Sequence, residues 1–210
     1  MAKGKVRVAV KLTKNEQKKQ KDALKQFARY LPTLQLKKQQ LQVVIRQAEA
    51  EIIELREQQK RAIAGIDNWI AVYGGNSELP PSRSIGNLIK VKEIKVDKGN
   101  IAGVVVPVFN ALVFEDISYD LREYPLWVDR ALVALRDIAK YDALISTLEE
   151  RIRLLEKELR ITSQRVNLFE KVKIPETKEN IRVIGIYLQD QQTSAVVRGK
   201  IAKKKLVRVS

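Results

Sequence analysis

The chain contains no cysteine and no histidine among its 210 residues. Without cysteine there are no disulfides and no thiol nucleophiles, and without either residue there are no Cys/His zinc sites and no imidazole acid–base chemistry. A chain lacking cysteine fits an intracellular, reducing location. Aromatic residues are scarce at 6%, whereas charged residues make up 31%. This balance favours long exposed helices with a thin core over a compact globule.

Long hydrophobic runs and nucleotide-binding glycine patterns are also missing. The longest uncharged apolar stretch, residues 101–114, is interrupted by Pro107 and Asn110 and is too short to cross a bilayer as a helix. The apolar run near the start is too short for a signal peptide. None of the nine glycines lies in a phosphate-cradling motif. We therefore expect a soluble, non-catalytic protein with no cofactor and no metal site, which associates with a membrane only through a partner.

Two long stretches carry a coiled-coil repeat, in which apolar residues recur alternately every three and four positions. The first seam is interrupted only by Lys38 and Gln59, and the second only by Thr162. A strict period of about 3.5 residues imposes a left-handed supercoil. The first seam consists of Leu24, Phe27, Leu31, Leu34, Lys38, Leu41, Ile45, Ala48, Ile52, Leu55, Gln59, Ala62, Ile66, Trp69 and Tyr73. The second consists of Trp127, Ala131, Ala134, Ile138, Tyr141, Ile145, Leu148, Ile152, Leu155, Leu159, Thr162, Val166 and Phe169.

The two seams predict a mainly α fold, namely a long antiparallel two-helix coiled coil formed by the N- and C-terminal helices, with a small β-hairpin between them. The pairing is expected within one chain, because the middle segment is long enough for the chain to turn back. It should bring Ile45 close to Leu155 or Leu159. The predicted parts are a basic N-terminal arm (1–12), the first helix (13–73), a middle segment (74–125) and the second helix (126–208).

Local signals set the ends and irregularities of the two helices. Thr13 and Glu16 match a capping box at the start of the first helix, and the glycines at 74 and 75 end it. Pro32 removes a backbone donor, so we expect a kink near residues 28–32. Pro175 either kinks the second helix or begins a new one. Apolar residues resume after it one position out of phase, at Ile181, Ile184, Leu188 and Ala195.

The middle segment contains strand and turn signals. Residues 87–96 alternate, residues 97–100 read as a turn, and residues 101–106 are rich in β-branched side chains, which predicts a hairpin over about 88–106. Residues 112–124 have no clear period and are predicted to be irregular. Because a lone hairpin is marginally stable in water, this one should pack on the coiled coil or on another subunit. Trp69, Tyr73 and Trp127 are expected to close the adjoining end of the coiled coil.

The formal net charge of +15 is concentrated at the two ends of the chain. Residues 1–21 hold eight basic side chains against one acidic, and residues 198–210 hold six basic and no acidic side chains. In an antiparallel arrangement both basic ends should meet at one tip. A basic end is typical of a solvated tail or of a nucleic-acid-binding arm.

Three motifs resemble those of the D subunit of the V/A-type rotary ATPases and ATP synthases, and their wording is most similar to the bacterial branch. The first is LTKNEQKKQK followed by YLPTLQLKKQQLQ, and the second is NIAGVVVPV at residues 100–108. The third, TSQRVNLFEKVKIPETKENI at residues 162–181, is similar to the family pattern T-x-x-R-V-N-x-x-E-x-x-x-I-P. The residues that carry the first and third motifs are Tyr30, Pro32, Leu36, Lys37, Lys38, Thr162, Arg165, Val166, Asn167, Glu170, Ile174 and Pro175.

The resemblance implies a non-catalytic rotor shaft in the central stalk, which couples ATP hydrolysis or synthesis in a hexamer of A and B subunits to ion transport by a membrane ring. It implies that the F subunit binds the middle part and that one end seats on the stalk subunit above the ring. It also implies a peripheral location on the cytoplasmic side of the plasma membrane, without membrane insertion. The short C-terminal KKKLVRVS departs from the family's often longer tails.

Two groups of contact residues are expected on this basis. The shaft surface facing the hexamer should include Lys11, Lys14, Lys18, Lys21, Arg198, Lys200, Lys203 and Lys204. The hairpin, which in the family stimulates ATPase activity, should offer Leu88, Val91, Ile94, Val96, Ile101, Val104 and Val106 to a partner. The competing interpretations are a homodimeric coiled coil that binds nucleic acid through its basic arms, and a cytoskeletal or membrane-tether coiled coil. We expect no nucleic-acid binding, because the helical body has no basic stripe and no aromatic platform.

Overall fold

The computed structural model describes residues 10–67, 84–120, 122–125 and 127–209, with side chains except at 67 and 206–209. Trp69, Tyr73 and most of the predicted basic arm therefore lie outside the described residues. The helical elements are α1 (Lys14–Asp67), the 3₁₀ turn η3 (Ile85–Leu88), α3 (Val128–Leu168), the π-helical turn η4 (Phe169–Lys173) and α4 (Ile174–Val209). The strands are β1 (Val91–Ile101) and β2 (Val104–Phe114).

The chain divides into two compact units. We call Lys38–Ile161 the central unit, and we call Met1–Lys37 together with Thr162–Ser210 the terminal unit. The central unit holds most of α1 and α3 together with the hairpin. The terminal unit holds the first part of α1, the last part of α3, η4 and α4. This division cuts across both predicted long helices, and the four predicted parts of the chain stay a prediction.

α1 begins where the sequence predicts. The Glu16 backbone N–H donates to Thr13 Oγ1 over 3.2 Å, which satisfies one of the donors that a helix start leaves open. The second half of the capping box does not form, because the Glu16 carboxylate instead accepts a 2.9 Å hydrogen bond from Gln20 Nε2. α1 runs on through Pro32, so this proline does not end the helix, and a kink there stays a prediction.

In the central unit α1 and α3 pair antiparallel along the predicted seam. Leu41 and Leu155 are fully buried and pack with Ile45, while Leu159 lies against the same cluster. Further along, Ile52 packs with Ile145 and Leu148. As residue numbers rise on α1 they fall on α3, which confirms the predicted antiparallel pairing within one chain. Two polar pairs join the helices as well. Arg56 Nη2 donates to Glu149 Oε1 over 2.7 Å, and Gln59, a polar position of the seam, donates through Nε2 to Asp142 Oδ1 over 2.6 Å.

The hairpin differs from the predicted one in length and in the place of its turn. β1 and β2 form a two-stranded antiparallel sheet from Val91↔Phe114 to Ile101↔Val104. The turn lies at Ala102 and Gly103, whose φ angles of 51° and 82° are both positive, as a tight hairpin turn of primed type requires. Gly103 N–H donates to Asn100 Oδ1 over 3.0 Å. The predicted turn at 97–100 is therefore wrong, and residues 112–114 belong to a strand.

The properties of Gly99 account for the wrong prediction of a turn at residues 97–100. A Cβ at this position would lie 2.8 Å from Val108 Cγ2 on the neighbouring strand. Its missing side chain therefore allows close packing within the sheet, which is a recognised use of glycine inside strands. In the sequence, a glycine next to Asn100 looks the same whether it forms a turn or allows close packing inside a strand.

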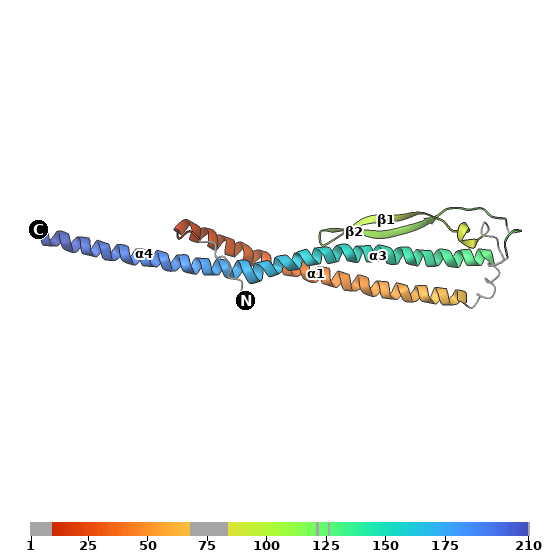
Figure 1. Cartoon of the computed structure of the whole chain (residues 1–210), viewed down its shortest axis with the longest axis horizontal. Helices are drawn as coiled ribbons and strands as arrows, with labels where there is room; N and C mark the ends of the chain where they lie inside the picture. The colour runs from red at the N-terminus through yellow and green to blue at the C-terminus, as the bar shows by residue number, and fades with distance from the viewer. Residues whose placement is uncertain (1–9, 68–83, 121, 126, 210) are drawn as a thin grey trace, which may run out of the picture. The chain divides into compact units, whose positions relative to one another are not determined.

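The turn end of the hairpin packs on the coiled coil of the central unit. Val106 is 1% exposed and joins the cluster of Leu41, Ile45 and Leu155, with Ile101 and Val104 against it. At the other end of β2, the Arg136 guanidinium of α3 stacks over the Phe114 ring at 5.6 Å. Figure 1 shows both strands running beside α3. Of the two predicted supports for the hairpin, the coiled coil is the one observed.

A second hydrophobic cluster packs around the start of α3. Ile85 and Leu88 of η3 are buried against Val128 and Leu132, and Trp127 packs beside them. Trp127 thus takes the predicted closing position at this end of the central unit. The segment that returns from β2 is held here as well, because the Tyr119 hydroxyl donates a short hydrogen bond to Asp129.

In the terminal unit α1 pairs with η4 and with α4. Phe27 and Phe169 bring their ring centroids within 5.2 Å. Further along, Gly185 lies beside Gln17, where a Cβ would be 3.4 Å from Gln17 Nε2. Ile184 is fully buried. The two helices are therefore antiparallel within this unit too.

The π-helical turn η4 accounts for the phase shift in the second seam. The Ile174 N–H donates to the Phe169 carbonyl, which adds one residue relative to an α-helical turn. After it, Thr177 and Ile184 are buried, while Val183 and Tyr187 are 41% and 40% exposed. The seam is thus re-registered by one position, as the sequence indicates. Pro175 lies one residue into α4, and helical structure continues on both sides of it.

Candidate functional site

The described residues contain no constellation suited to catalysis. Among them, no group of three or more acidic side chains could hold a metal ion. No helix in the described parts of the chain combines the length and the apolar character that a membrane span needs. The resolved pKa shifts belong to surface pairs. The hydrogen bond to Asp129, then burial, raises the pKa of Tyr119, and the Arg153 guanidinium lowers the pKa of Glu150. The features of the described residues that suit contact with a partner are exposed basic and apolar side chains.

The basic residues predicted to face the hexamer are all exposed, and all belong to the terminal unit. They fall into two groups instead of meeting at one tip. The group on and before α1 lies beside the part of α4 near Gly185, because Gln17 contacts that position. Arg198 follows 13 residues later, about 20 Å further along the helix at about 1.5 Å per residue. The expected single tip is therefore wrong for the described residues.

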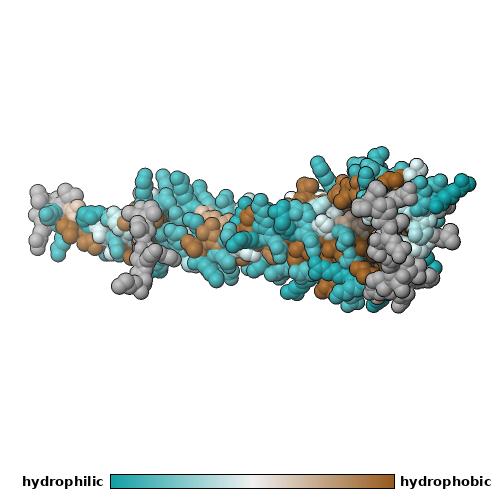
Figure 2. Space-filling view, turned by 45° about the vertical axis from the view of Figure 1, so that its right-hand side comes forward, coloured by the Kyte–Doolittle hydropathy of each residue, from teal (hydrophilic) through white to brown (hydrophobic). Residues whose placement is uncertain are grey.

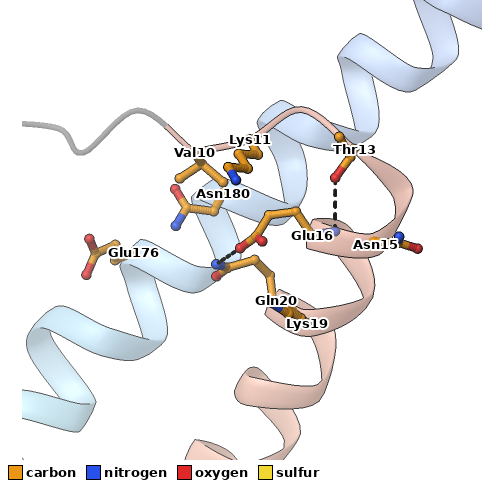
Figure 3. A pocket seen from close by; sticks show the side chains of 9 residues that line it. All are labelled: Val10, Lys11, Thr13, Asn15, Glu16, Lys19, Gln20, Glu176 and Asn180. Atoms are coloured by element: carbon orange, nitrogen blue, oxygen red, sulfur yellow. Dashed lines mark hydrogen bonds between the residues drawn. The ribbon is translucent and has the colours of Figure 1, made fainter.

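The reason for the offset is that helical structure starts only at Lys14, so α1 has no described turns to place beside the end of α4. Val10 and Lys11 instead line one cavity with Glu176 and Asn180 of α4 (Figure 3). From Gln189 to Lys205 every side chain of α4 is exposed. A full stretch of basic helix is thus open to a partner.

A cavity of about 570 Å³ lies where the residues before α1 meet α4. In Figure 3, Val10 and Lys11 approach Asn180, and the Glu16 carboxylate reaches Gln20. The remaining lining residues are Thr13, Asn15, Lys19 and Glu176. Lys11 and Lys19 line the cavity together with Glu16 and Glu176, so both signs of charge are present. This arrangement fits the seating of a chain segment on α4 better than the binding of a small ligand.

The family-motif residues divide into buried and exposed sets. Val166 is 5% exposed in the seam, and Glu170, Ile174 and Pro175 lie in or next to η4. This motif therefore marks the re-registered stretch of the coiled coil. The exposed set comprises Tyr30, Pro32, Leu36, Arg165, Asn167, Glu170 and Pro175, while Lys37, Lys38 and Ile174 are half-buried.

The predicted hairpin contacts also divide into two sets. Leu88 and Val106 are buried in the chain's own core, and Ile101 and Val104 pack against that core. Leu88 and Val106 are therefore covered by the chain itself, whereas Ile101 and Val104 are half-buried and their contact with a partner stays a prediction. Val91, Ile94 and Val96 are 48%, 46% and 44% exposed and remain open.

The outer side of β2 is not among the predicted contacts. Because side chains alternate along a strand, Val105, Pro107 and Phe109 lie on the face opposite to buried Val106. Val105 is 60% exposed. The signal was present in the strand sequence VVVPVFNALVF, which is apolar at nearly every position and therefore on both faces. In the region of the hairpin, Figure 2 shows hydrophobic residues at the surface between hydrophilic ones.

Comparison with known proteins places this architecture in a family. The profile of the family described as the D subunit of ATP synthase matches residues 16–204. The V-type ATP synthase D subunit of Borreliella burgdorferi is 50% identical over 199 residues, covering 95% of this chain and 96% of that protein. The V-type ATP synthase D subunits of Chlamydia caviae and Chlamydia muridarum are 36% and 35% identical, each over 94% of this chain and over 93% and 96% of their own lengths.

The match includes the antiparallel coiled coil, the hairpin and the re-registered second seam, each of which the structure describes independently. The chain therefore belongs to the family of ATP synthase D subunits.

Proposed function

We propose that this protein is the non-catalytic rotor shaft in the central stalk of a V/A-type rotary ATPase or ATP synthase. The shaft turns inside a hexamer of A and B subunits, where ATP is hydrolysed or made, and couples that chemistry to ion transport by a membrane ring. The F subunit and the stalk subunit above the ring are the further partners. The complex is peripheral on the cytoplasmic side of the plasma membrane.

The observation that carries this proposal is the pairing of two long helices within one chain. A shaft that transmits torque has to resist twisting, and two helices with a packed seam resist it better than one. The fully buried Leu41 and Leu155 pack in the seam of the central unit, and within the terminal unit Phe27 packs against Phe169. No ATP site is needed on such a subunit.

The basic stretch of α4 supplies the contact with the hexamer in this proposal. Arg198, Lys200, Lys203 and Lys204 are exposed beside the apolar residues Val197 and Ile201, which are 49% and 52% exposed. In this proposal, the exposed basic and apolar side chains of α4 contact acidic loops or carbonyl dipoles on the inner surface of the A/B hexamer. Charges of this kind act mainly on association, through fields that salt screens over about 8–10 Å.

The test of rotation uses the absence of native cysteine. Ser194→Cys places one thiol on exposed α4, and oxidation with a cysteine on the facing A or B subunit ties shaft to hexamer in the assembled complex. We expect ATP turnover to stop on oxidation and to return on reduction, because a shaft held to its sleeve cannot turn. Turnover that continues in the fully cross-linked complex would show that the subunit does not rotate against the hexamer.

A matched control holds the two helices of this chain to each other. Gln59→Cys together with Asp142→Cys, joined by a short bismaleimide, replaces the existing 2.6 Å contact between α1 and α3. We expect turnover to survive, because the shaft then turns as one body. If this link stopped turnover as well, the loss seen with Ser194→Cys would not report on rotation.

The charge contact has its own test. Changing Lys200, Lys203 and Lys204 to glutamine should weaken assembly with the A/B hexamer at low salt and flatten the decline of affinity with salt. The helix content should not change, because all three side chains are exposed. Assembly as tight as that of the unmodified chain at low salt would remove the charge contact from the proposal and leave the rotor role intact.

A further inference from the structure

Among the described residues, no element outside the hairpin covers its apolar outer face, where Val96 and Val105 are exposed and Pro107 and Phe109 are half-buried. In the regular stretch of the sheet, Val96 pairs with Phe109, Lys98 with Pro107 and Asn100 with Val105. These six residues share the face opposite to Gly99 and Val106, the face that packs on the coiled coil. An apolar sheet face in water is stabilised when another element covers it.

The edges of the sheet are poorly suited to accept an additional strand. In β2, Pro107 has no N–H to offer, and prolines inside sheets belong to edges that do not pair further. In β1 the pairing shifts register between Val91 and Glu93 and between Lys95 and Val96. β1 also carries exposed Lys92, Lys95 and Lys98. Register irregularities and lysines are the features by which natural sheets discourage strand addition.

The face itself has the dimensions of a helix-binding surface. Two strands lie about 4.8 Å apart, so the sheet with its side chains is about as wide as one α-helix, whose diameter is about 10 Å. The row Val105, Pro107 and Phe109 spans about 13 Å at about 3.3 Å per residue, which matches two to three helical turns. One helix can therefore cover the row along its length.

The charge beside the apolar row is positive. β2 has no charged residue between Val104 and Phe114, and Lys98 is exposed on the outer face across from Pro107. The nearest acid, Asp97, alternates to the other face, where its Oδ2 accepts a 3.0 Å hydrogen bond from Asn110 Nδ2. The outer face thus presents apolar side chains with a cation at the margin and no acid opposing it.

We propose that the outer face of the hairpin, formed by Val96, Val105, Pro107 and Phe109 beside Lys98, binds the apolar side of an amphipathic helix that carries acidic residues along one flank. This helix belongs to another subunit of the same complex, so the inference rests on the proposed function. The anchors are Phe109 and Val105, and Lys98 sets the orientation of the helix by pairing with its acidic flank. Aromatic anchors with charged groups at the margin are the usual arrangement at protein interfaces.

The direct test is a photo-cross-link in the complex assembled from the purified subunits. The probe is p-benzoylphenylalanine, introduced at Phe109 and, as the matched control, at Ile53, which is 61% exposed on α1 in the same unit. We expect position 109, but not position 53, to cross-link one segment of another subunit. Mass spectrometry should identify this segment as helical and amphipathic, with acidic residues on one flank.

Charge variants sharpen the test. Lys98→Glu should weaken binding of the cross-linked subunit at least about tenfold relative to Lys98→Gln, because it places like charges together. Reversal of one acidic residue in the cross-linked segment to lysine should restore the affinity. Since a change at Phe109 can disturb the hairpin itself, Val105→Asp provides a second variant at an exposed position next to the turn. It should reduce cross-linking from position 109 at least about tenfold, with an unchanged melting temperature.

Several outcomes would overturn the inference. These are equal cross-linking at positions 109 and 53, a cross-link to lipid, a cross-link to a second copy of this chain, or a cross-link to a segment without acidic residues. The same preparations report on the proposed function through assembly and ATP turnover. A complex that assembles and stops turning over when its shaft is tied, but shows one of these outcomes at Phe109, disproves the helix-binding face alone. A chain that does not assemble with these subunits disproves both.

Discussion

The central and terminal units are built from the same two-helix pairing but differ in what covers it. In the central unit the hairpin lies on the seam, and Leu41, Leu155 and Val106 are each at most 1% exposed. In the terminal unit, Val166 and Ile184 are the buried aliphatic side chains among the described residues, and α4 is exposed throughout from Gln189 to Lys205. A two-helix seam without a third layer buries little apolar surface, so we expect the terminal unit to be the less stable of the two.

The largest expected loss of stability comes from truncating a buried side chain in the seam of the central unit, which the hairpin covers. Leu155→Ala should lower the free energy of unfolding by about 3–4 kcal/mol. The substitution leaves a cavity that α1 and the hairpin surround, and these elements cannot move in to fill it. The matched Ile184→Ala in the terminal unit should lower it by only about 2 kcal/mol, because a seam open on one side relaxes more easily. Urea unfolding followed by circular dichroism measures both. Equal losses would contradict the difference drawn between the units.

The next effect concerns the π-helical turn. Deleting exposed Lys171 should convert η4 to α-helix and turn Ile184 by about 100° away from α1. We expect a loss of about 2 kcal/mol in the local opening free energy of residues 14–37, with residues 41–66 unchanged, measured by amide hydrogen exchange. Lys171→Ala is the control and should stay within about 0.5 kcal/mol. Unchanged protection in the deletion variant would show that η4 does not set the register.

A glycine-to-alanine substitution should lower stability in the central unit and raise it in the terminal unit. Gly103→Ala places a side chain at φ 82° in the hairpin turn and should destabilise the protein by about 1 kcal/mol. Gly199→Ala lies in α4, where a Cβ meets nothing within 4 Å, and should raise the local helix stability by up to about 1 kcal/mol. Thermal melts of both variants check the signs, and a shared sign would show that backbone conformation is not the cause.

The smallest effect is a pH dependence confined to the central unit. The hydrogen bond to Asp129 raises the pKa of Tyr119 above its ordinary value of 10.0. Because the folded pKa is the higher one, the stabilisation is complete below pH 10 and is lost as pH rises through the folded pKa. The difference in unfolding free energy between the protein and Tyr119→Phe should therefore shrink above pH 10. A difference that grew there would reverse the assigned direction.

Much of the fold could be predicted because coiled-coil seams are local, repeated signals. The antiparallel pairing of Ile45 with Leu155 and the cap at Thr13 follow from spacing and from one hydrogen-bonding side chain. The phase shift after Pro175 is also visible in the sequence, but the π-turn that produces it is not. A proline and a displaced apolar pattern are compatible with several backbone solutions, and side-chain packing selects one of them.

The hairpin contacts could be predicted only in part, because a strand sequence does not say which face is covered. The apolar run of β2 predicts burial equally for Val105 and Val106, yet one is 60% exposed and the other 1%. Gly99 looked like a turn glycine, although it serves close packing against Val108. The offset of the two basic groups was hidden as well, because it depends on where helix α1 begins relative to α4.

The sequence by itself determined that two helices pair along a heptad seam, that the chain carries no thiol or imidazole chemistry, and that the basic charge is concentrated towards its ends. These properties depend on residue type and on short-range periodicity, and both can be read directly from the amino-acid sequence. Only the tertiary structure decided the turn at Ala102 and Gly103, the face of β2 that Leu41 and Leu155 cover, and the part of α4 that stays exposed. Each of these depends on contacts between residues far apart in sequence, whose geometry is settled by packing.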